Sequence, residues 1–94
     1  MIVDEELRKV RLAEQRQPFM AALLRKVHGP RWLEDRALRR ALGVSLEEAG
    51  VDAVIRLGLC LRPRPDHLDE DIAAIAQRAG VRPEAVRAVV EAAK

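Results

Sequence analysis

One stretch of the sequence decides the fold, Ile72-Ala-Ala-Ile-Ala-Gln-Arg-Ala-Gly-Val-Arg-Pro-Glu-Ala-Val-Arg-Ala-Val-Val90. It predicts a short helix, a tight turn at Gly80 and a second helix set across the first. Gly80 can adopt the left-handed conformation that ends a helix. The small side chain of Ala76 allows the two helices to approach closely. Three valines are expected to face the core that the helices share: Val81, Val86 and Val89.

This pattern resembles the DNA-reading helix-turn-helix of lac-repressor-type regulators. In that family the unit runs Ile-Ala-x-x-Ala-Gly-Val, then four variable residues, then Val-x-x-Val. The fixed places are filled here by Ile75-Ala76, Ala79-Gly80-Val81, Val86 and Val89. The match covers residues 72–90 and falls mostly on packing positions. The resemblance implies a helix-turn-helix fold for this stretch and double-stranded DNA as its partner.

The remainder of the chain also has the composition of a helical protein. Its apolar residues are mostly Leu, Val, Ile and Ala, with Phe19 and Trp32 as the only aromatic residues. Apolar side chains recur at helical spacing over residues 4–16, 18–28 and 31–42. Residues 45–61 are apolar on nearly all sides, which predicts a buried central helix. The chain is short enough for one domain.

Local signals mark the ends of these helices. Gly29-Pro30 and Gly43 are stop signals. Ser45 and Glu48 have the spacing of a capping box that starts the central helix. We therefore expect an all-α single domain of five or six short helices over residues 1–94. It would consist of a helical body over 1–65 and a helix-turn-helix-like unit over 66–94.

Charge is unevenly distributed along the chain. The formal net charge is +2. Residues 1–65 hold 13 basic and 9 acidic side chains, a charge of +4, whereas residues 66–94 hold 4 basic and 6 acidic ones, a charge of −2. The candidate DNA-reading part is thus the acidic part. A basic cluster in the body could face phosphates or could simply be the solvated side of amphipathic helices: Arg25, Lys26, Arg31, Arg36, Arg39 and Arg40.

Two functions remain open for the last two helices, and DNA binding is the leading one. The first is a small DNA-binding regulator that acts as a homodimer, because dimers read two half-sites. Its arginines could reach guanine edges or phosphates, and its glutamate could accept a hydrogen bond from cytosine. The candidate DNA-binding residues are Arg78, Arg82, Glu84 and Arg87. The last helix is expected to begin at Arg82 or Pro83, with Ala85 among its outward residues. The alternative is a non-enzymatic protein-interaction module, an adaptor, regulatory subunit or inhibitor, which uses the same corner for packing.

Groups suited to catalysis are few. The chain contains no Thr or Tyr, and Ser45 is explained by its capping role. His67 and Asp71 stand one helical turn apart, a spacing compatible with a metal, but no second His is near them in sequence. Cys60 lies in an apolar run, which predicts an inert thiol. We expect no enzymatic activity, no metal and no cofactor.

The sequence also suggests where the protein acts. Its acidic start lacks the shape of a signal peptide, and no apolar run is long enough to span a membrane. With a single cysteine, no internal disulfide can form. These features predict a cytoplasmic protein. The narrow apolar stripe on residues 4–16 leads us to expect self-association.

Overall fold

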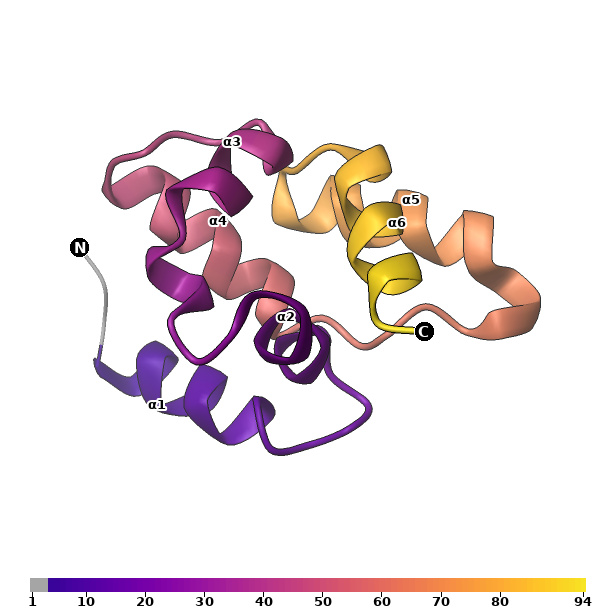
Figure 1. Ribbon diagram of the computed structural model, residues 1–94, viewed down its shortest axis with the longest axis horizontal. Helices are drawn as coiled ribbons and strands as arrows, with labels where there is room; N and C mark the ends of the chain where they lie inside the picture. The colour runs from indigo at the N-terminus through magenta and orange to yellow at the C-terminus, as the bar shows by residue number, and fades with distance from the viewer. Residues whose placement is uncertain (1–3) are drawn as a thin grey trace.

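The computed structural model describes residues 4–94, and the regular elements in that range are helices joined by turns and short connectors (Figure 1). The prediction of an all-α fold is confirmed, and no described helix is long and apolar enough to cross a membrane. One isolated bridge pairs Phe19 with Leu61. The α-helices are α1 (Asp4–Ala13), α2 (Met20–His28), α3 (Arg36–Leu42), α4 (Glu48–Gly58), α5 (Leu68–Ala79) and α6 (Pro83–Ala92). Two short 3₁₀ helices are η1 (Trp32–Glu34) and η2 (Pro65–His67).

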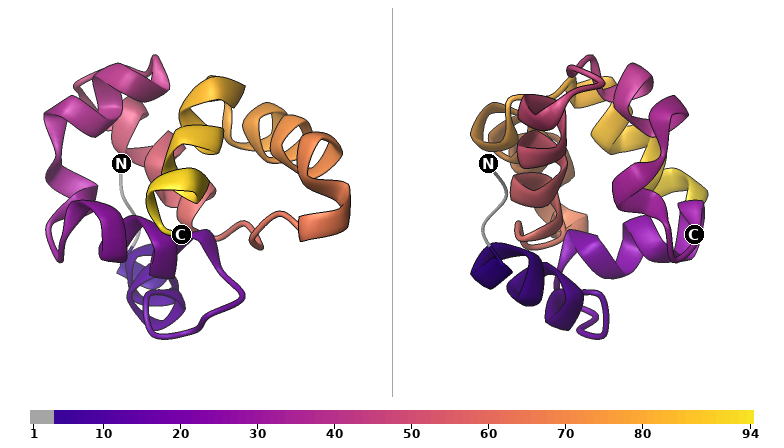
Figure 2. Two further views of the ribbon diagram at one scale, coloured as in Figure 1. Left: turned by 45° about the vertical axis from the view of Figure 1, so that its right-hand side comes forward. Right: turned by 90° about the vertical axis from the view of Figure 1, so that its left-hand side faces the viewer.

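Helix α4 is the central element, as its apolar composition predicts. It packs against α1, α2, η1 and α5 (Figures 1 and 2). Gly58 is a contact point on this helix. A Cβ added there would lie 2.8 Å from Cη2 of Trp32 and 3.1 Å from Cγ2 of Val10. The missing side chain therefore allows η1 and α1 to approach the last turn of α4.

The start of α4 differs from the sequence-based expectation. Ser45 does not cap the helix, because its Oγ accepts the backbone N–H of Glu47 at 2.9 Å in a short turn before it. The predicted capping box is therefore wrong, and Glu47 is the N-cap residue without a side-chain cap. The helix continues through Gly50, where a Cβ would lie only 1.5 Å from the carbonyl oxygen of Ser45. Glycine at this position lets the turn fold back onto the first turn of the helix.

The helix predicted over 31–42 is broken in two. After η1, the side chain of Asp35 accepts the backbone N–H of Leu38 at 3.1 Å and so caps a new helix, α3. Arg39 was expected on the outer side, but it is buried. Its guanidinium donates to the carbonyl oxygens of Leu33 at 2.8 Å and Leu46 at 3.0 Å. Arg39 thus ties η1 to the loop that follows α3.

Helix α1 is attached to the body by both apolar and ionic contacts. Val10 and Ala13 are buried. Just after the helix, the buried carboxylate of Glu14 forms ion pairs with Arg11 at 2.6 Å and with Arg25 of α2 at 3.0 Å. The expected apolar stripe on residues 4–16 is therefore largely used within the chain.

Helices α5 and α6 form at the predicted positions. Gly80 has φ 74° and ψ 39°, the left-handed conformation, and its N–H donates to the carbonyl oxygen of Ala76 at 2.9 Å. Pro83 begins α6 at a position where proline is favoured. The expected burial of Ala76 and of the three valines 81, 86 and 89 is confirmed. The N–H of Arg82 donates to the carbonyl oxygen of Leu42 at 3.0 Å, which joins this corner to α3.

Replacing Ala76, which is 3% exposed, by leucine should overpack the crossing of α5 and α6. We expect Ala76→Leu to lower the free energy of unfolding by about 1–3 kcal/mol. Ala73→Leu is the matched control, because Ala73 is exposed on the same helix. The control should stay within about 0.5 kcal/mol of the parent. Urea unfolding that gives equal stabilities for the two variants would contradict this packing.

Candidate functional site

The four candidate DNA-binding residues lie in different surroundings. Arg78 is exposed in the last turn of α5. The side chain of Arg82 lies against Gly43 at the end of α3, where an added Cβ would be 2.6 Å from its Nε. Arg87 pairs with Asp69 in the first turn of α5, and Glu84 is exposed on α6. No described hydrogen bond or ion pair joins any two of the four.

The outward face of α6 is balanced in charge. Its basic side chains are Arg82 and Arg87, and its acidic ones are Glu84 and Glu91. The ion pair with Asp69 further offsets the charge of Arg87 and raises the pKa of its guanidinium. Ala85, which we expected to face outward, is only 8% exposed and belongs to the core. The surface that would meet a DNA groove is therefore not a continuous positive face.

The basic cluster expected in the body does not form one patch. Arg25 pairs with Glu14, and Arg31 pairs with Glu34 at 2.6 Å. Lys26 donates to the carbonyl oxygen of Ala93 at 3.0 Å. Arg39 is buried. Arg36 and Arg40 are exposed and make no ion pair with another described residue. The remaining two free guanidinium groups are too few for a phosphate-binding surface of the kind expected.

A groove of about 610 Å³ lies between the end of α4, the connector after it and α5. We call it the arginine groove. Its lining combines four guanidinium groups and one carboxylate with four aliphatic side chains, Leu59, Leu61, Ala74 and Ile75, which we call its aliphatic floor. The residues that line it are Arg56, Leu59, Cys60, Leu61, Arg62, Arg64, Asp71, Ala74, Ile75 and Arg78.

The four arginines of this groove differ in how firmly they are held. Arg56 donates to the carbonyl oxygen of Ala79 at 3.3 Å, at the C-terminal end of α5. Arg62 donates to Oε1 of Gln17 at 3.0 Å. Arg78 makes no hydrogen bond or ion pair with any residue in the range 4–94. Arg78 is thus the guanidinium most available to a ligand.

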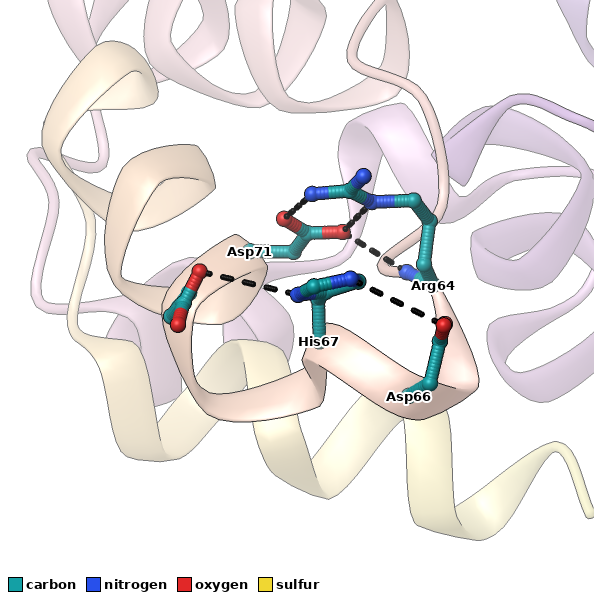
Figure 3. Close-up of polar contacts among 5 residues, drawn as sticks. Arg64, Asp66, His67 and Asp71 are labelled. Atoms are coloured by element: carbon teal, nitrogen blue, oxygen red, sulfur yellow. Dashed lines mark hydrogen bonds and ion pairs between the residues drawn. The ribbon is translucent and has the colours of Figure 1, made fainter.

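Arg64 is held by Asp71 in a three-bond arrangement (Figure 3). The backbone N–H of Arg64 donates to Oδ2 of Asp71 at 2.8 Å, and its Nε donates to the same oxygen at 2.9 Å. Its Nη2 donates to Oδ1 at 3.1 Å. These bonds from Arg64 lower the pKa of Asp71 to about 2. The pair fixes the connector to the first turn of α5 and sets one wall of the groove.

His67 and Asp71 do not form the pair that a metal would need. Asp71 turns toward Arg64, whereas His67 lies 3.7 Å from carboxylate oxygens of Asp66 and Glu70 (Figure 3). Within the described part of the chain, no group of three or more His, Cys, Asp or Glu residues has the geometry for a metal ion.

Cys60 is half-buried at the groove and not in the core. Its Sγ donates to the carbonyl oxygen of Arg56 at 3.3 Å. Burial raises the pKa of the thiol, which outweighs the opposite effect of Arg78. A protonated thiol is a poor nucleophile. Cys60 therefore contributes apolar lining to the groove.

A second, smaller groove of about 270 Å³ lies where α2, α3 and α6 meet. Its lining is apolar and rich in alanine, with Val27, Leu38 and Val89 at its base. His28 is the polar side chain in this lining, and its Nδ1 lies 3.5 Å from Oδ2 of Asp35. This groove offers little to select a ligand.

Comparison of the chain with protein-family models, curated proteins and solved structures finds no match. The residues themselves must therefore indicate the function. Sequence patterns pointed to α6, whereas the structure assembles the larger candidate site beside α5. Of the four residues singled out from the sequence, Arg78 alone lines that groove.

The Arg64–Asp71 pair predicts a specific acid sensitivity. The pKa of Asp71 is lowered from 3.8 to about 2 in the folded protein. Its contribution to stability is therefore present above pH 3.8 and is lost as the pH falls toward 2. Asp71→Asn should be less stable than the parent near neutral pH, and this deficit should shrink in acid.

Urea unfolding at neutral pH and at pH 2 measures this difference. Glu6→Gln serves as the control, because Glu6 is exposed and has no ion pair with another described residue. A deficit of Asp71→Asn that stays constant between the two pH values would contradict the assigned role of the pair.

Proposed function

We propose that this chain is a non-enzymatic protein-interaction module that binds its partner through the arginine groove. The observation that carries the proposal is that apolar surface and an unpaired positive charge occur together in this groove. An aliphatic floor with the exposed side chain of Leu61 lies beside the unpaired guanidinium of Arg78. Arginine next to apolar surface is typical of protein-binding sites.

The chemistry of the groove favours binding over catalysis. Its carboxylate, Asp71, is engaged by Arg64 and stays ionised down to low pH. Its thiol, Cys60, is stabilised in the protonated form. Neither group is poised as a base or nucleophile near neutral pH. What the groove offers a ligand is positive charge and apolar surface.

A second candidate function is DNA binding by a homodimer. The conformation of the turn supports it, because left-handed Gly80 and the close crossing at Ala76 fit the lac-repressor-type pattern. Exposed Arg78 and Arg82 flank this turn. The balanced charge of the α6 face makes this proposal the weaker one, since phosphate contacts supply much of the affinity for DNA.

Site-specific photocrosslinking in living cells separates the two functions. The photoreactive residue p-benzoylphenylalanine replaces Ala74 in the groove, Ala88 on the exposed face of α6, or Ala49 near the start of α4 as a control. We expect a discrete protein adduct from position 74 and none from position 49. Adding Arg78→Glu should abolish the adduct, whereas adding Arg40→Glu should preserve it.

Arg40 is the matched control for Arg78. Both are exposed arginines in the last turn of a helix, without a described partner, so reversing either charge has a similar effect on the helix dipole. An adduct between position 88 and DNA would favour the second function. Absence of any adduct from position 74 would contradict the first.

A further inference from the structure

We infer that the arginine groove binds an acidic linear segment of a partner protein, one that carries a large aliphatic side chain among its carboxylates. This inference rests on the proposed function and specifies the chemistry of the partner. Its basis is the pairing of excess positive charge with an exposed aliphatic floor in one concave surface.

The charge of the groove selects an anionic partner. Four guanidinium groups and one carboxylate line it, which leaves a net positive charge among the described residues. Arg64 is already neutralised by Asp71, but Arg78 has no partner among them. Guanidinium groups bind carboxylates with good geometry and remain charged at all relevant pH values. Arg78 is therefore the expected anchor for a carboxylate.

The floor distinguishes a protein segment from a nucleic acid. It is formed by Leu59, Leu61, Ala74 and Ile75, and none of the lining side chains is aromatic. Proteins that bind single-stranded nucleic acid usually stack the bases on aromatic side chains. An aliphatic floor matches an aliphatic anchor, which loses water when it is buried there.

Leu61 is presented to a ligand by the backbone on both sides of it. The N–H of Met20 donates to the carbonyl oxygen of Cys60 at 2.8 Å, and the N–H of Arg62 donates to that of Pro18 at 2.7 Å. These bonds hold the connector extended. The side chain of Leu61 remains 61% exposed, and its own N–H and C=O have no described partner. An extended segment could pair with these backbone groups while its aliphatic side chain contacts Leu61.

The test uses fluorescence anisotropy of a fluorescein-labelled peptide built from repeated Glu-Asp-Leu triplets. Two companion peptides separate the contribution of the carboxylates from that of the leucine. One has Gln-Asn-Leu triplets and so lacks the carboxylates, and the other has Glu-Asp-Ala triplets and so lacks the leucine. A labelled oligothymidylate of equal charge reports binding to any polyanion. We expect saturable binding of the acidic leucine peptide and weaker binding of all three others.

Matched protein variants locate the binding site. Arg78→Glu and Leu61→Ser should each weaken binding by about tenfold, the loss expected for removing one anchor of an interface. Arg40→Glu and Leu12→Ser should bind like the parent. Leu12 is the counterpart of Leu61, because these two are the exposed large hydrophobic residues in the described range, at 57% and 61%.

Three outcomes would overturn the inference. An equal loss of peptide affinity in Arg78→Glu and Arg40→Glu would show nonspecific electrostatic attraction. Equal affinity for oligothymidylate would show a preference for any polyanion. Absence of peptide binding, together with a protein adduct from position 74 in cells, would leave the interaction function intact and reject the acidic partner. If that adduct is also absent, the proposed function itself fails.

Discussion

The structure depends on the close approach of other elements to the last turn of α4. Gly58 has no side chain, so the ring of Trp32 and the side chain of Val10 can reach the helix backbone there. Trp32 is fully buried as a result, and α1 is held against the body. The apolar side of α4, where Ala53, Val54, Ile55 and Leu57 are buried, is stable in water only when neighbours cover it. The packing of α1, α2, η1 and α5 around α4 meets that requirement.

The arginine groove is a consequence of this arrangement. After the buried end of α4, the chain continues as an extended connector and reaches the far end of α5 (Figure 1). Helix α5 then returns, and Arg56 of α4 contacts the carbonyl oxygen of Ala79 near its end. The connector and α5 thus form two walls that converge on α4. The Arg64–Asp71 pair holds these walls together at the other end.

Sequence patterns predicted those features that depend on neighbouring residues. The turn at Gly80 and the start of α6 at Pro83 follow from the conformational preferences of glycine and proline, and both occur where expected. The spacing of apolar residues indicated the core side of both helices. The prediction that Ala85 faces outward was wrong, because alanine is small enough for either side of a helix.

Features that depend on distant parts of the chain could not be predicted in this way. Arg39 looked like a surface residue of an amphipathic helix, but its guanidinium is buried where it donates to carbonyl oxygens of η1 and of the loop after α3. Ser45 had the spacing of a capping residue, but the close approach of its carbonyl oxygen to Gly50 places it outside the helix. The sequence did not predict the groove, because its arginines come from three separate segments: α4, the connector and α5. The one sequence signal for it was the extended segment Arg62-Pro-Arg-Pro65, which carries two of them.

We propose that this chain acts through the arginine groove and not through the exposed face of α6. Amide chemical shifts of the ¹⁵N-labelled protein test it most directly, recorded during titration with the acidic leucine peptide and, separately, with duplex DNA. The account predicts that the peptide shifts residues 59–64 and 71–78, while DNA leaves 84–91 unchanged at moderate salt. Saturable shifts over 84–91 with DNA, and none around the groove with the peptide, would contradict it.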